Sequence, residues 1–103
     1  MDKWAALEAA KPRLLARFQD AGAERIEYTV GFVCPYQVSV WLGTATDPQK
    51  AALAGEERLA ATVRDILTSS GLGETDAVFD GVVVQSQETV DRDYEGSWFY
   101  ALR

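Results

Sequence analysis

The stretch Phe79-Asp-Gly-Val-Val-Val-Gln-Ser-Gln-Glu-Thr-Val-Asp-Arg-Asp-Tyr-Glu-Gly-Ser-Trp-Phe-Tyr-Ala-Leu-Arg103 is the most apolar and aromatic part of this chain. Residues 82–84 are β-branched valines and residues 98–100 are aromatic, and both residue types favour the half-buried surface of a sheet. Residues 91–96 lie between them and have the composition of a turn, with a final glycine that can adopt a positive φ. The stretch therefore predicts two strands joined by a polar turn, a β-hairpin.

Two further strands are predicted upstream of this hairpin. Residues 24–33 and 37–44 alternate between apolar and polar side chains, which is the pattern of half-buried strands. We expect them to form an antiparallel pair with residues 34–36 at the loop. One register puts every apolar side chain on a single face: Phe32 with Val38, Val30 with Val40, and Tyr28 with Leu42. That register places Trp41 on the opposite face, across from Thr29.

Each pair of strands is preceded by a predicted helix. Residues 2–21 carry an apolar stripe at spacings of three and four, and Pro12 is expected to kink or break this helix. The members of the stripe are Trp4, Leu7, Ala10 or Lys11, Leu14 and Phe18. Residues 46–49, Thr-Asp-Pro-Gln, are typical of a helix start, with Thr46 or Asp47 as the capping side chain, a proline in the first turn and a glutamine three residues after the threonine. We expect this second helix to run to about Ser69.

The predicted order of elements is helix, strand, strand, helix, strand, strand. It indicates a single α+β domain over residues 1–103, made of two α-β-β units at about 1–44 and 45–103. Each helix has one apolar stripe, so the two helices would cover one face of a four-stranded, mainly antiparallel sheet. The order of the strands and the register of the C-terminal hairpin stay open.

Composition excludes several classes of function. The chain has 16 acidic and 10 basic residues and a formal net charge of −6, whereas a nucleic-acid-binding protein needs a basic surface to neutralise phosphates. Its single cysteine cannot form an internal disulfide, which suits a reducing compartment. We see no signal peptide and no stretch long enough to span a bilayer, so we expect a cytoplasmic protein without a membrane partner.

No catalytic or metal-binding pattern is complete in this sequence. The chain has no histidine, the commonest general base and zinc ligand, so Ser-His-Asp and Cys-His catalysis cannot be assembled from it. Cys34 has no basic neighbour in sequence to lower its pKa, so we interpret it as a turn residue. Residues 91–96 resemble the first half of a calcium loop, but Leu102 stands where that loop requires a glutamate. We predict no catalytic residue, no metal and no cofactor.

Carboxylates are the remaining candidates for acid–base chemistry. The residues in question are Asp80, Glu88, Asp91 and Asp93. No pattern in the sequence brings any two of them into one pocket. The simpler interpretation is that they are solvated surface charges.

Aromatic residues carry the functional hypothesis. Consecutive residues of a strand point to alternate faces, so at least one ring of residues 98–100 must point away from the helices. If Val82 and Val84 face the core together with Trp98, Tyr100 and Leu102, then Phe99 joins Val83 and Trp41 on the outer face. An exposed apolar patch there would mark an interface or a ligand groove. The alternative is that the C-terminal segment is covered on both sides or that these are scattered exposed aromatics. The predicted partner-binding residues are Trp41, Val83, Trp98, Phe99 and Tyr100.

We therefore predict an acidic, non-enzymatic protein-interaction domain of the inhibitor or immunity, chaperone or regulatory type. It would self-associate as a homodimer or hold another protein on its aromatic sheet face. The alternative is a small-ligand-binding protein or enzyme with a pocket between helices and sheet, built from carboxylates and tyrosines. The tyrosines considered for that pocket are Tyr28, Tyr36, Tyr94 and Tyr100. A deep pocket with converging polar groups would favour the alternative, and a filled core with an apolar sheet face would favour the interaction domain.

Overall fold

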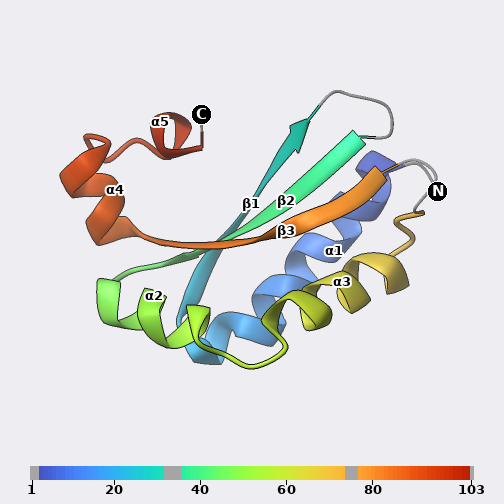
Figure 1. Ribbon diagram of the computed structural model, residues 1–103, viewed down its shortest axis with the longest axis horizontal. Helices are drawn as coiled ribbons and strands as arrows, with labels where there is room; N and C mark the ends of the chain where they lie inside the picture. Colours follow the sequence, from blue (N-terminus) through green and yellow to red (C-terminus); the bar gives the residue numbers. More distant parts are fainter. Residues whose placement is uncertain (1–2, 32–35, 74–76, 103) are drawn as a thin grey trace.

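A three-stranded sheet covered on one side by helices forms the body of the protein (Figure 1). The computed structural model describes residues 3–31, 36–73 and 77–102. The strands lie in the order β1-β2-β3, with β1 antiparallel and β3 parallel to β2. Their bounds are β1 (Ala23–Gly31), β2 (Tyr36–Thr44) and β3 (Ala77–Ser86). The helices are α1 (Lys3–Phe18), α2 (Asp47–Ala54), α3 (Leu59–Ser69), α4 (Gln87–Asp93) and α5 (Trp98–Ala101), and a 3₁₀ turn, η1 (Gln19–Ala21), links α1 to β1.

The fold is α+β, but the predicted four-stranded, mainly antiparallel sheet with two helices is wrong. The sheet of the described residues has three strands and is mixed, and five α-helices accompany it. The strand β3 is parallel to β2 because α2 and α3 carry the chain back beneath the sheet before β3 begins (Figure 1). The second α-β-β unit does not form, since the chain turns helical after Ser86.

Local capping explains why helices replace the last predicted strand. The Ser86 hydroxyl accepts a hydrogen bond from the Thr89 amide at 3.1 Å and thereby caps α4. Ser97 caps α5 in the same way through the Tyr100 amide at 3.4 Å. Trp98 and Ala101 are buried while the two residues between them are exposed, which is the period of a helix and not of a strand.

The β1–β2 hairpin keeps the predicted faces but not the predicted register. The observed partners are Val30 with Val38, Tyr28 with Val40, and Ile26 with Leu42. The prediction is therefore wrong by two residues, a shift that leaves every side chain on its expected face because the period of a strand is two. Trp41 lies on the face away from the helices, as expected, although its partner on β1 is Glu27. Phe32 and Cys34 lie outside the described residues.

The second predicted helix is broken into α2 and α3. Gly55 ends α2, and Arg58 adopts a left-handed φ of 62° just before α3. Leu53 and Leu59 are six residues apart and would point to different sides of a continuous helix, at about 100° per residue. The break allows both to pack on the sheet, Leu53 buried and Leu59 partly buried against the core. The helix α1, by contrast, continues past Pro12 to Phe18.

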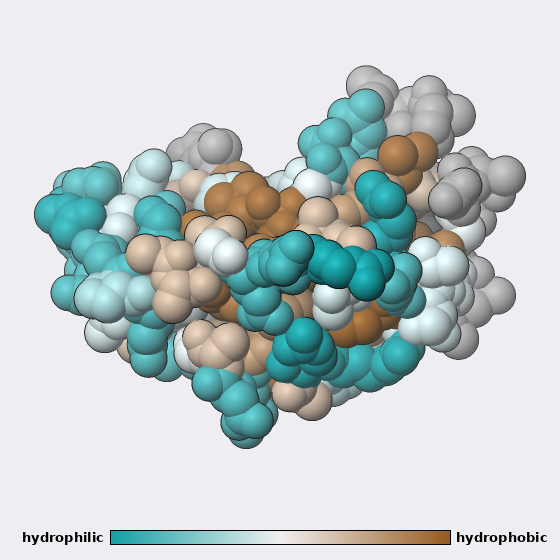
Figure 2. Space-filling view, turned by 60° about the horizontal axis from the view of Figure 1, so that its bottom comes forward, coloured by the Kyte–Doolittle hydropathy of each residue, from teal (hydrophilic) through white to brown (hydrophobic). Residues whose placement is uncertain are grey.

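Buried apolar residues form two separate clusters. The main core lies between the sheet and the layer of α1, α2 and α3, and α1 contributes Leu7, Ala10, Leu14 and Phe18 to it. A second, small cluster joins Val90 of α4 to Trp98 and Ala101 of α5. On the helix-covered side, hydrophilic residues interrupt the apolar ones (Figure 2). None of the described helices combines the length and apolar character needed to cross a membrane.

Candidate protein-interaction surface

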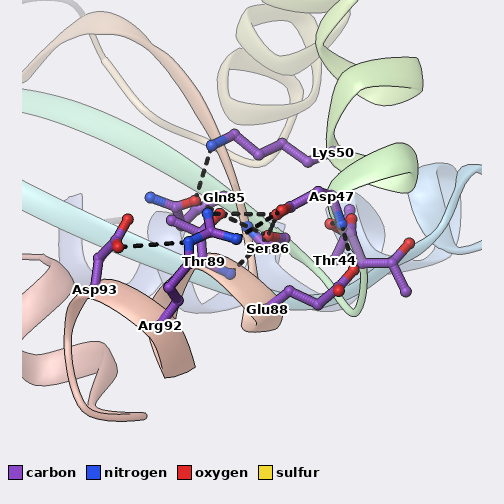
Figure 3. A network of polar contacts seen from close by, with 10 residues as sticks. Thr44, Asp47, Lys50, Gln85, Ser86, Glu88, Thr89, Arg92 and Asp93 are labelled. Carbon is purple, nitrogen blue, oxygen red and sulfur yellow. Dashed lines mark hydrogen bonds and ion pairs between the residues drawn. The ribbon is translucent and has the colours of Figure 1, made fainter.

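A polar network joins the start of α2 to the start of α4, at the ends of the parallel strands β2 and β3 (Figure 3). Its centre is the Asp47 carboxylate. Oδ1 accepts hydrogen bonds from the Ser86 hydroxyl and from the Thr89 hydroxyl, the latter at 2.8 Å. Oδ2 accepts from the Arg92 guanidinium at 3.2 Å. We call Asp47, Ser86, Thr89 and Arg92 the Asp47 latch.

Hydrogen bonds that involve backbone groups also join the start of α2 to the start of α4. The Asp47 amide donates to the Glu88 carboxylate at 2.8 Å, and the Glu88 amide donates to the Ala45 carbonyl at 3.2 Å. Lys50 of α2 adds a hydrogen bond from its Nζ to the Gln85 side chain at 3.0 Å. Both helix starts are thus fixed to each other, so α4 leaves the sheet in a defined direction.

The electrostatics of the latch suit a structural role. The hydrogen bonds from Ser86 and Thr89, together with Arg92, lower the pKa of Asp47 from 3.8 to about 2. A carboxylate with so low a pKa is a poor general base at neutral pH. Ser86 is fully buried and directs its hydroxyl at Asp47. The latch therefore holds two helices together and presents no activated nucleophile.

Trp98 anchors α5 on the outer face of the sheet, the side opposite α1, α2 and α3 (Figure 1). Its ring packs on Gly43, where an added Cβ would lie only 3.0 Å from the Trp98 Cη2 atom, so a larger residue there would have to displace the ring slightly. The guanidinium of Arg25, a residue of β1, lies 4.9 Å from the centroid of the Trp98 ring. Trp98 Nε1 donates to the Gln87 side chain at 2.7 Å. Trp98 is buried by these contacts within its own chain.

Four of the predicted partner-binding residues remain on the outside. Trp41 is half-buried on the outer face, donates from Nε1 to Thr29 at 3.2 Å, and pairs in register with the exposed Val83. On α5, Phe99 is 69% exposed and Tyr100 is 52% exposed. The Trp98 ring of α5 packs on Gly43, two residues along β2 from Trp41 and on the same face. We call Trp41, Val83, Phe99 and Tyr100 the outer aromatic surface.

The candidate carboxylates do not meet in one place. Asp80 accepts from Ser39 at 3.4 Å, and Glu88 is engaged by the Asp47 amide. The other two contact neighbours on α4: Asp91 accepts from Gln87 at 2.8 Å, and Asp93 pairs with Arg92 at 3.5 Å. Among the residues placed by the structure, no three metal-ligating side chains cluster. The calcium-like segment 91–96 ends α4 and forms the turn before α5.

The tyrosines considered for a ligand pocket do not converge either. Two cavities of about 320 and 390 Å³ flank the sheet, one between α3 and β3 and one between α1 and β1. Tyrosine lines neither of them. Tyr28 donates to the Leu7 carbonyl at 2.7 Å, and burial, with a smaller contribution from Glu8, raises its pKa. Tyr94 and Tyr100 are exposed.

The sequence contained a capping signal for α4 and α5 that the strand prediction did not use. Ser86 and Ser97 each stand three residues before the residue whose amide they accept, as helix caps do. Asp47, predicted as a possible cap, instead bonds across to α4. Comparison with family models, curated proteins and solved structures finds no match for this chain.

Proposed function

We propose that this protein is a non-enzymatic interaction domain that binds another protein, or a second copy of itself, through the outer aromatic surface. The observation that carries the proposal is the exposure of Phe99 and Tyr100, 69% and 52%, on a helix whose third aromatic ring is buried as an anchor. Burying each exposed ring is worth on the order of 2–3 kcal/mol. A partner that covers the two rings would gain this free energy on binding.

The way α5 is held supports recognition. A helix of four residues is not stable by itself, because nucleation is unfavourable and few bonds follow. The Trp98 anchor holds it against the sheet, and the Asp47 latch fixes α4, the helix that precedes it. The backbone that carries the two exposed rings is thereby held in place before any partner arrives, which lowers the entropy cost of binding.

The face of the sheet is a better candidate than its edges. The outer strands β1 and β3 both carry irregularities, at Ala23–Arg25 and at Asp80. On β3 the extra residue is charged, and Gly81 beside it has a φ of 154°. Bulges and charges discourage the pairing of edge strands with another chain. We therefore assign binding to the outer face.

A photo-crosslinking experiment in the cell of origin tests this proposal. Benzoylphenylalanine replaces Phe99 in one variant and Ala60, an exposed residue of α3, in the control. We expect one discrete cross-linked product at position 99 and none at position 60. A product of twice the chain mass would identify a second copy as the partner. Equal labelling at both positions, or none at position 99, would contradict the proposal.

A further inference from the structure

We infer that the outer aromatic surface binds a basic segment of another protein, one that combines arginine or lysine with apolar side chains. The inference rests on the proposed function and specifies the chemistry of the partner. It follows from the charges around the aromatic rings and from the contacts that these charges already make.

Carboxylates flank the surface on both sides. On the sheet, Asp80 reaches the outer face, where it accepts from Ser39, a neighbour of Trp41 on the same side of β2. Next to α5, residues 87–97 contain four acidic residues and one arginine. Within that segment Asp91 and Glu95 are exposed, and the Glu95 side chain makes no hydrogen bond or ion pair among the described residues.

Arg25 and Arg92, the described arginines next to α5 and its anchor, are already engaged. Arg25 pairs with Glu27 at 3.3 Å and lies over the Trp98 ring. Arg92 pairs with Asp47 at 3.2 Å and with Asp93 at 3.5 Å. Asp80, Asp91 and Glu95 consequently have no ion-pair partner in the part of the chain that the structure covers. The described part of this surface therefore carries three carboxylates that are open to a basic partner.

This combination selects one kind of partner. Arginine and lysine pair with carboxylates and also lie favourably over aromatic rings, so one basic side chain can use both features. A second copy of the chain would bring the same carboxylates together, on a molecule of net charge −6, and like charges across an interface are unfavourable. We therefore favour a basic partner over a homodimer.

The test uses random dodecapeptides displayed on phage and selected on the full-length protein. We expect the selected peptides to be enriched in arginine or lysine together with apolar residues. Neutralising the surface, in the triple variant Asp80→Asn, Asp91→Asn, Glu95→Gln, should weaken their binding about tenfold. A matched triple on the far side, Asp20→Asn, Glu57→Gln, Asp65→Asn, removes the same charge from exposed positions and should leave the affinity within about twofold.

A further variant, Phe99→Ser with Tyr100→Ser, separates the inference from the proposed function. Loss of basic-peptide binding in this variant and in the outer triple supports both. If the selected peptides are neutral or acidic and their binding is lost in the Phe99→Ser, Tyr100→Ser variant, the inference of a basic partner is wrong and the proposed interaction surface is supported. Basic peptides weakened equally by both triples would also overturn the inference. If no selected peptide depends on the rings, both ideas fail. Circular dichroism of each variant checks that it is folded.

Discussion

The Asp47 carboxylate gives the folded state a pH dependence with a defined sign. Its pKa falls from 3.8 to about 2 on folding, so the folded state favours the ionised form. The stabilisation is complete above about pH 4 and is lost as the pH falls towards 2. We expect Asp47→Asn to lower the urea midpoint of unfolding at pH 7. The difference in midpoint between the variant and wild type should become smaller as the pH is lowered.

Urea titrations of both proteins between about pH 2 and pH 7 check this expectation. Asp65→Asn, at an exposed position of α3, is the control and should follow wild type throughout. A gap between Asp47→Asn and wild type that stays constant with pH would show that the latch does not depend on the charge.

Single residues also show where sequence reasoning succeeded. A cap at Thr46 or Asp47 was predicted from residue types alone, and Thr46 provides it: its hydroxyl accepts from the Gln49 amide at 3.3 Å, and the Gln49 side chain accepts from the Thr46 amide at 3.0 Å. This contact spans three residues, so local sequence determines it. The packing of Trp98 on Gly43 joins residues far apart in sequence, and no local pattern encodes it.

At the scale of elements, the break between α2 and α3 is a source of strain that mutation can relieve. Arg58 adopts a φ of 62°, a conformation that costs a residue with a Cβ about 1 kcal/mol and glycine very little. We expect Arg58→Gly to stabilise the protein by roughly 0.5–1 kcal/mol. The same change at Arg64, inside α3, should destabilise it by about 1 kcal/mol.

Urea denaturation of the two arginine variants measures this difference. Both lose one positive charge and gain one glycine. Because Arg64→Gly also removes the contact of the guanidinium with the Phe79 ring, 5.6 Å from its centroid, the decisive result is the sign of the change at Arg58. Destabilisation of similar size in both would mean that Arg58 does not hold the left-handed conformation in solution.

The elements that could be predicted are those with a clear period or a local cap. Alternation revealed β1, β2 and their faces, and the spacing of apolar residues revealed α1. The last element was missed because residues 98–100 have strand-forming side chains, while Ser97 and the burial of Trp98 select one helical turn. The predicted outward ring exists nevertheless: Phe99 and Tyr100 are both exposed, through helical and not strand geometry.

For the whole molecule, two separate cores imply two levels of stability. The main core takes no residue from α4 or α5, and those helices bury their own small cluster of Val90, Trp98 and Ala101. Parallel pairing of β3 and the docking of α5 depend on contacts between distant segments, which is why composition and periodicity predicted neither. Segments with few buried contacts open more readily than the global unfolding transition.

Hydrogen exchange of Trp98→Ala and Phe99→Ala tests this division. The first variant removes the ring that packs on Gly43 and anchors α5, whereas the second removes a neighbouring ring that is 69% exposed. We expect Trp98→Ala to speed amide exchange in α4 and α5 at least about tenfold, with the helices and strands of the main core little changed. Phe99→Ala should leave exchange in both regions near wild type. Uniformly faster exchange throughout Trp98→Ala would indicate one cooperative unit, in which case the rings of α5 could not be undocked without unfolding the sheet.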